Sequence, residues 1–99
     1  MELKTNEVYT FKLMSGEEVI GKVTDIDTTY ITLNEPLSVA PSQQGMGLVP
    51  SVFTSEADAP VRLNINNITM YTDTAEPIKV KYIETTTGIK VPEKKIVLG

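Results

Sequence analysis

Hydrophobic and polar residues alternate over residues 8–39, and this alternation predicts three consecutive antiparallel strands. The turn after the first strand contains Gly16, which can adopt the positive φ that a short hairpin requires. In the second strand, the missing side chain of Gly21 allows a sharp bend. The alternation therefore predicts a strongly bent meander of three strands.

The parity of the apolar residues predicts which side chains share a face of this meander. In the second strand we expect Val19 and Val23 on one face, with Ile20 and Ile26 on the other. In the third strand the apolar residues all occupy odd positions. We therefore expect them to form one apolar face, made of Ile31, Leu33, Leu37 and Val39.

The alternation breaks over residues 40–60, which are rich in turn-forming and polar residues. We expect an elaborated connection there, with a turn-rich loop at residues 40–47. Residues 48–53 are a candidate strand within it, and Pro50 would confine that strand to a sheet edge because proline cannot donate to a central ladder.

Two further strands are predicted at residues 61–65 and 68–71, where alternation resumes. Apolar residues occupy odd positions in the earlier strand and even positions in the later one. The phase changes across Asn66 and Asn67, so a bulge or tight turn is expected there. Asparagine tolerates the left-handed backbone region that such a turn often requires.

The pattern after residue 75 leaves two alternatives open. Residues 78–82 alternate like a strand and include β-branched side chains. Pro77 instead suits the first turn of a helix, and Gly88 suits the position just after its end. These residues alone do not choose between a strand and a helix.

The composition limits the class of protein. Ninety-nine residues suit a single domain, 1–99, with one modest core. No run of residues approaches the ~18 apolar residues of a membrane span, and no signal-peptide pattern opens the chain. There is also no cysteine for a disulfide. We therefore expect a cytoplasmic protein without membrane contact. The net charge of −4 argues against the binding of duplex DNA. It is compatible with a local site for single-stranded nucleic acid, bound through stacking and amide contacts.

Histidine, the commonest general base and metal ligand in enzymes, is missing from this chain. There is no histidine and no cysteine, so no serine has a histidine partner and a zinc site would need carboxylates alone. Asp25 and Asp27 share a face and offer a Mg²⁺ site as an alternative, but exposed turn carboxylates are the simpler interpretation. We therefore expect no enzymatic activity, no catalytic residue, no metal and no cofactor.

Residues 13–36 resemble the first Sm motif of the Sm, LSm and Hfq proteins. The resemblance rests on Leu13-x-x-Gly-Glu-Glu-Val-Ile-Gly-Lys-Val23, followed by Asp27 and by Ile31-Thr-Leu-Asn-Glu-Pro36. Asn67-Ile68 is similar to a pair in the second Sm motif. The chain is similar in particular to the Sm-like proteins encoded by tailed phages, notably cyanophages.

The resemblance implies a mainly β fold. That fold is a small, strongly bent, five-stranded antiparallel Sm-like (SH3-type) barrel over about residues 6–72. The region from Pro77 to Ile89 is similar to a C-terminal segment of the phage members. This similarity favours the helix alternative over about residues 77–87 and leaves residues 88–99 as a tail.

The resemblance also implies self-association into a homo-oligomeric ring of about five to seven subunits. In the family, strand four of one subunit joins strand five of the next. Arg62 is the one charge on the corresponding two strands here, so neither edge is guarded by charge. The implied subunit-interface residues are Val61, Leu63, Ile65, Ile68 and Met70.

Single-stranded RNA is the ligand that the resemblance implies, bound by loops near the pore. The candidate RNA-binding residues are Asp27, Thr28, Thr29, Tyr30, Asn66 and Asn67. The chain departs from the family at both loops, because residues 27–31 lack the uracil-reading Asn and Asn64-Ile65 replaces the usual Arg-Gly. The alternative is therefore a structural or protein-interaction ring, such as a virion or assembly component, without RNA. A phage-encoded protein of either kind would act in the host cytoplasm.

Overall fold

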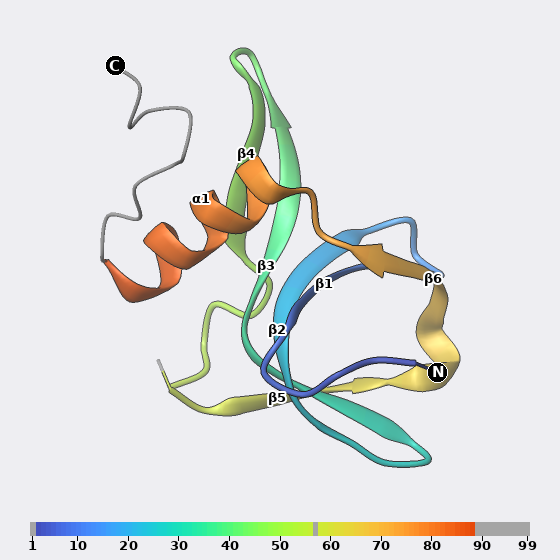
Figure 1. The fold of residues 1–99 in the computed structure, drawn as a ribbon. Helices are drawn as coiled ribbons and strands as arrows, with labels where there is room; N and C mark the ends of the chain where they lie inside the picture. The colour runs from blue at the N-terminus through green and yellow to red at the C-terminus, as the bar shows by residue number, and fades with distance from the viewer. Residues whose placement is uncertain (1, 57, 89–99) are drawn as a thin grey trace.

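The chain forms one antiparallel sheet with a helix packed on it, in a computed structural model that describes residues 2–56 and 58–88 (Figure 1). The strands are β1 (Val8–Leu13), β2 (Glu18–Ile26), β3 (Tyr30–Ser42), β4 (Gly45–Pro50), β5 (Pro60–Asn64) and β6 (Ile68–Asp73). The 3-10 helix η1 (Ile65–Asn67) separates β5 from β6, and the α-helix α1 (Glu76–Thr87) follows β6. The predicted mainly β fold with a helix after the strands is confirmed. The predicted tail lies outside the described residues from residue 89 onward.

The sheet has the strand order β4-β3-β2-β1-β6, and β5 pairs with the first half of β3. Because β4 pairs with the second half of β3, this long strand has two different neighbours along one edge. Within the described part of the chain, no ladder joins β5 to β6. The sheet is therefore open, and β5 and β6 each keep one unpaired edge.

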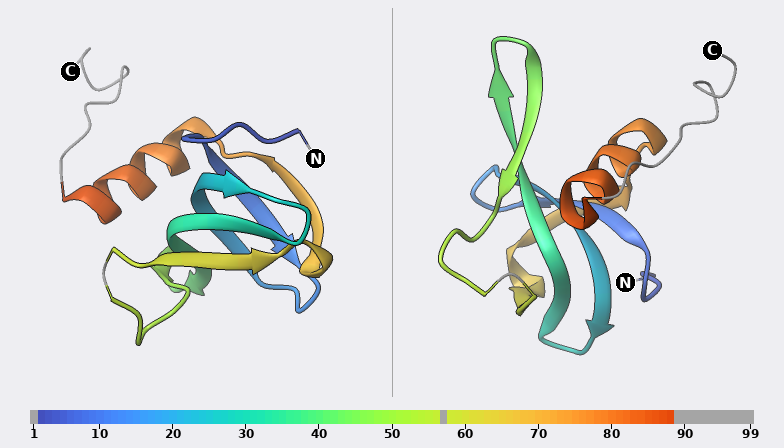
Figure 2. Two further views of the ribbon diagram at one scale, coloured as in Figure 1. Left: turned by 90° about the horizontal axis from the view of Figure 1, so that it is seen from below. Right: turned by 90° about the vertical axis from the view of Figure 1, so that its left-hand side faces the viewer.

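The second half of β3 and β4 form a hairpin arm that projects from the rest of the molecule (Figure 2). Its register runs from Leu37 opposite Pro50 to Ser42 opposite Gly45, and Gly45 has a φ of 110°. The sequence assigned most of this region to a loop, which was wrong. Towards its tip the arm is exposed on both faces, so a backbone ladder forms there without any apolar alternation to reveal it.

A β-bulge bends β3 at its middle. Glu35 and Pro36 together lie opposite the single residue Gly21 of β2. Glu35 has a φ of 48°, a left-handed conformation that few non-glycine residues adopt. A Cβ at position 21 would lie 3.1 Å from Cδ1 of Leu33, so a side chain there would press on the core. The predicted bend at Gly21 is thus produced by the bulge on the facing strand.

The bulge divides the apolar residues of β3 between two clusters. The first cluster, enclosed by the strands and η1, contains Tyr9, Phe11, Val19, Val23, Ile31 and Leu33. The second cluster, between the opposite side of the sheet and α1, contains Val8, Ile20, Leu37 and Tyr82, with Val39 packed against it. The prediction of a single apolar face on β3 was wrong, because the extra residue of the bulge reverses the parity beyond it.

A second register shift changes the face of the sheet on which the later side chains of β2 lie. It lies between Val23 and Asp25, and it turns Ile26 toward the first cluster. Ile20 packs in the second cluster, so the expectation that Ile20 and Ile26 share a face was also wrong. Val19 and Val23 do share a face, as predicted.

The boundaries of α1 follow the signals in the sequence. Pro77 lies in the first turn, and Gly88 adopts a φ of 72° and donates to the carbonyl of Glu84 at 2.9 Å. The strand alternative for residues 78–82 is therefore wrong. Within the helix, the buried residues are Val80 and Tyr82.

Tyr82 anchors the helix at the bend of the sheet. Its side chain is 3% exposed. Its hydroxyl accepts a hydrogen bond from the N–H of Lys22 at 3.1 Å and donates to the carbonyl of Asn34 at 2.6 Å, and these two residues are cross-strand partners. Burial raises the pKa of the Tyr82 hydroxyl to about 12, and the nearby charge of Glu35 acts in the same direction.

Candidate functional site

Asp27 organises the turn between β2 and β3. Its Oδ1 accepts hydrogen bonds from the backbone N–H groups of Thr29 and Tyr30, both at 2.7 Å, and its own N–H donates to the Tyr30 carbonyl at 3.0 Å. The hydrogen bonds from Tyr30 and Thr29, together with the charge of Arg62, hold the pKa of Asp27 below its ordinary value. The carboxylate therefore shapes the turn, and Thr28 and Thr29 are exposed at its tip.

The second turn of the candidate site is η1. The side chain of Asn64 caps it by accepting a hydrogen bond from the N–H of Asn66 at 2.9 Å. The predicted turn at Asn66 and Asn67 is confirmed, and both residues are exposed. Neither has a positive φ, so the expectation of a left-handed residue was wrong. A single 3-10 turn changes the phase instead.

A backbone hydrogen bond joins these two turns. The N–H of Ile65 donates to the carbonyl of Thr29 at 2.9 Å, which places η1 beside the β2–β3 turn. The structure thus brings the six candidate RNA-binding residues, at positions 27–30 and 66–67, onto neighbouring turns. Tyr30 is 39% exposed on one of these turns, and Asn66 and Asn67 are exposed on the other. Together these groups offer one stacking surface and several hydrogen-bonding groups.

Arg62 belongs to the same region, although the sequence suggested only that it was a charge on an edge strand. It is exposed on β5, opposite Thr32 of β3, and its charge acts on Asp27. A guanidinium at this place is suited to a phosphate group. Only the pairing of β5 with β3 brings Arg62 to the turn, and a periodic pattern does not reveal which strands pair.

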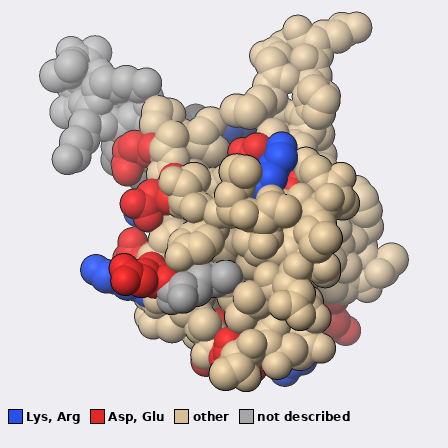
Figure 3. Space-filling model, turned by 90° about the vertical axis from the view of Figure 1, so that its right-hand side faces the viewer, with Lys and Arg blue, Asp and Glu red and all other residues tan. Residues whose placement is uncertain are grey.

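The candidate subunit-interface residues lie on β5, η1 and β6. Four of the five are half-buried, namely Val61, Leu63, Ile65 and Ile68. The fifth, Met70, is 65% exposed on β6. Figure 3 views the side of the molecule that carries β6 and η1, and a broad part of this surface has no charged group. The side of the molecule that carries β6 and η1 thus includes a broad uncharged area (Figure 3).

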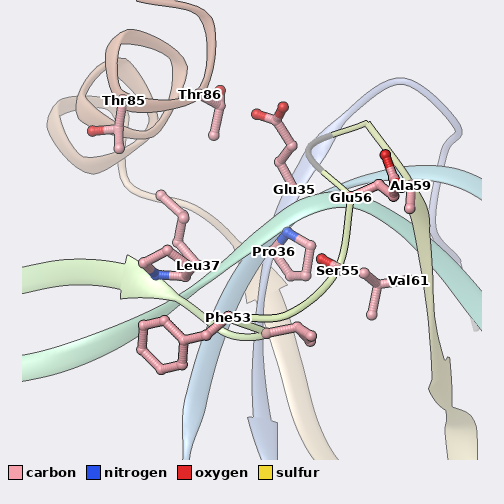
Figure 4. A pocket seen from close by; sticks show the side chains of 12 residues that line it. Glu35, Pro36, Leu37, Phe53, Ser55, Glu56, Ala59, Val61, Thr85 and Thr86 are labelled. Carbon is pink, nitrogen blue, oxygen red and sulfur yellow. The ribbon is translucent and has the colours of Figure 1, made fainter.

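Two cavities flank the bend of β3 near the C-terminal end of α1. The first has a volume of about 390 Å³ and lies toward the β4–β5 connection (Figure 4). The second has a volume of about 410 Å³ and is lined by Lys22, Lys79 and Tyr82, among others. Glu35 and Thr86 line both cavities, so the two spaces adjoin at the bulge. Nothing in the sequence pattern indicates either cavity.

The described part of the chain, residues 2–56 and 58–88, holds neither a cluster of metal-ligating side chains nor a membrane-spanning helix. No group of three or more His, Cys, Asp or Glu side chains in this part of the chain is placed to hold a metal ion, at Asp25 and Asp27 or elsewhere. None of its helices is both long and apolar enough to cross a membrane. No protein-family model matches the sequence, and none of the curated proteins compared with it is significantly similar.

Proposed function

We propose that this chain is the subunit of an Sm-like homo-oligomeric ring that binds single-stranded RNA at two neighbouring turns, the β2–β3 turn and η1. One observation carries the proposal: β5 and β6 follow each other in the chain, separated by η1, and each has an unpaired edge. An unpaired edge is a template for another strand. Because the two edges differ, pairing β5 of one copy with β6 of the next is head-to-tail, and it repeats until a ring closes.

The finer architecture that fits this assembly is the SH3-type barrel. The bulge at Glu35 and the register shift after Val23 supply the curvature that a small barrel needs. The turn η1 reverses the chain over three residues, and β6 then pairs with β1. In the ring, the neighbouring copy's β6 would add to the free edge of β5.

The proposed RNA site divides its tasks among four kinds of group. Tyr30 stacks on a base, and the amides of Asn66 and Asn67 bond to base edges. Arg62 contacts a phosphate and fixes the position of the strand. Asp27 holds the turn through its bonds to Thr29 and Tyr30 and does not itself contact RNA.

Light scattering after gel filtration tests the ring. We expect a mass of about five to seven subunits at micromolar concentration, and a monomer would contradict the proposal. Met70→Lys adds a charge to the β6 edge and should lower the assembled mass. The matched control is Met46→Lys, because Met46 is also exposed (55%) but lies on the hairpin arm. It should leave the mass unchanged.

Fluorescence anisotropy with short U-rich and A-rich RNA, at two salt concentrations, tests the RNA site. We expect saturable binding that Tyr30→Ala weakens about 5- to 160-fold, since stacking of one base contributes about 1–3 kcal/mol. Arg62→Gln should weaken binding to both RNAs and reduce the salt dependence. Phe53→Ala is the control, because Phe53 is an exposed aromatic residue outside both turns. An unchanged affinity in Tyr30→Ala would contradict the site.

A ring with a structural or protein-interaction role, without RNA, is the second candidate. The observations that favour it are the net charge of −4 and the absence of Lys and Arg from both turns, residues 27–30 and 64–67. The two functions share the ring and differ in the ligand. Assembly by light scattering combined with no RNA binding at low salt would establish the second candidate over the first.

A further inference from the structure

Apolar side chains make up much of the lining of the cavity between α1 and the β4–β5 connection (Figure 4). Pro36 and Leu37 of β3 and Val61 of β5 line its base. Val52 and Phe53 line it from the connection, and Phe53 is 79% exposed. Covering Val52, which is 42% exposed, and Phe53 would remove apolar surface from water, which is favourable.

The charged groups that line this cavity are two carboxylates, those of Glu35 and Glu56. The side chain of Glu35 points toward Thr86 of α1 (Figure 4). Among the described residues, no Lys or Arg lines the cavity. A segment that carries both apolar side chains and positive charge would therefore complement it.

Residues 89–99 have this composition. They contain Lys90, Lys94 and Lys95 against the single acidic residue Glu93, which is a net charge of +2. Residues 1–88 contain six basic and twelve acidic residues, a net charge of −6. The apolar residues of the segment are Ile89, Val91, Ile96, Val97 and Leu98. The segment thus complements the rest of the chain in charge and the cavity in polarity.

The last turn of α1 lies at the cavity. The segment begins directly after Gly88, and Thr85 and Thr86 in the last turn of the helix line the cavity wall. Eleven residues span at most about 36–40 Å when extended, and the molecule measures 27–30 Å along its two shorter axes. The segment is therefore long enough to reach the cavity of its own chain.

We propose that residues 89–99 dock into this cavity within the same chain. Lys94 and Lys95 pair with the carboxylates of Glu35 and Glu56, and the apolar residues 96–98 cover the exposed side chains of Val52 and Phe53. The proposal depends on neither the ring nor RNA binding.

Carbodiimide cross-linking of the full chain tests this docking, because the reagent joins only carboxylates and amines that are in contact. An equal mixture of ¹⁴N- and ¹⁵N-labelled protein is cross-linked, digested and analysed by mass spectrometry. We expect a link from Lys94 or Lys95 to Glu35 or Glu56, with both peptides carrying the same label. The absence of these links, links to Glu18 at equal yield, or a statistical mixture of labels would overturn the proposal.

Trypsin cleavage after Lys94 and Lys95 gives an independent measurement. Partly exposed ion pairs each contribute little, so Glu35→Gln combined with Glu56→Gln should accelerate cleavage by about three- to tenfold. Glu18→Gln is the matched control, because Glu18 is a half-buried carboxylate on β2 that does not line the cavity. Equal cleavage rates in all three proteins would contradict the proposal.

Discussion

The two halves of β3 belong to one strand and build different parts of the molecule. Residues 30–34 pair with β5 and contribute to the first cluster, whereas residues 37–42 pair with β4 and form the hairpin arm, which extends beyond the last pairs with β2 at residues 37 and 38. The difference arises at Glu35 and Pro36, which lie opposite one residue instead of two. One extra residue thus lets a single alternating run supply two apolar clusters.

The two clusters also differ in how well they are enclosed. Phe11, Val23 and Ile31 in the first cluster have no exposed surface. The second cluster depends on α1 for its cover, and Leu37 within it lines an open cavity. A closed cluster resists the loss of side-chain volume less well than an open one, because the space left behind stays empty.

Truncating one leucine in each cluster should give the largest effect. Leu33→Ala should lower the free energy of unfolding by about 3–5 kcal/mol, because it leaves an enclosed cavity. Leu37→Ala should cost about 2 kcal/mol, at the low end of the range, because its site already opens to solvent. Urea denaturation measures both values. Equal costs, or a larger cost for Leu37, would show that the clusters are equally enclosed.

Removing the hydroxyl of Tyr82, a residue of the second cluster, should have a smaller effect on the free energy of unfolding. Tyr82→Phe leaves the N–H of Lys22 and the carbonyl of Asn34 without this partner, so we expect a loss of about 1–3 kcal/mol in unfolding free energy. Tyr30→Phe is the matched control and should leave stability unchanged, because Tyr30 is exposed. A similar loss in both variants would contradict the anchoring role.

The pH dependence of the same hydroxyl has a defined sign. Its pKa is raised to about 12 in the folded protein, against an ordinary value of 10.0. The folded state therefore binds the proton more tightly than the unfolded state. This contribution to stability is complete below pH 10 and is lost as the pH rises toward 12. Denaturation between pH 9 and 12 should show the decline in the wild type but not in Tyr82→Phe.

Adding a methyl group at Gly21 should have the next largest effect on the free energy of unfolding. In Gly21→Ala the new Cβ would lie 3.1–3.3 Å from three carbons of Leu33. We expect a loss of about 1–2 kcal/mol, because the leucine side chain can shift only slightly. Gly47→Ala on the arm is the control, since its Cβ would approach only the Ala40 carbonyl, at 3.7 Å. An equal cost in unfolding free energy for both substitutions would show that the contact with Leu33 does not disfavour a side chain at position 21.

Asp27 should give the smallest and most local effect. Asp27→Ala removes both hydrogen bonds to the β2–β3 turn, so the amides of Thr29 and Tyr30 should exchange with solvent faster, while the core amides stay unchanged. Because the pKa of Asp27 is lowered from 3.8, its contribution is complete above pH 3.8 and is lost as the pH falls through the lowered value. Hydrogen exchange and an acid titration by NMR measure both outcomes.

The strands in which apolar and polar residues alternate were predictable because each carries its own signal. Alternation identified β1, β2, β5 and β6, and Gly16 has the positive φ expected for its hairpin, at 92°. Gly88 ends α1 for the same local reason. Such signals lie within a few residues of the structure that they specify.

Features that depend on contacts between distant residues could not be predicted in this way. Glutamate has no preference for the left-handed region, so Glu35 gave no hint of the bulge or of the parity change that follows it. The closeness of the two candidate turns rests on one bond between Thr29 and Ile65, and hence on the pairing of β3 with β5. The resemblance placed those turns together by analogy, while alternation contained no such information.

The anchoring of α1 by Tyr82 has a consequence for the order of folding. The hydroxyl binds residues 60 and 48 positions away, Lys22 and Asn34, on two strands that must already be paired. A helix of 12 residues without an N-terminal side-chain cap is barely stable alone. We therefore expect α1 to form after the folding transition state. Substitutions in α1 should then accelerate unfolding and leave the refolding rate nearly unchanged.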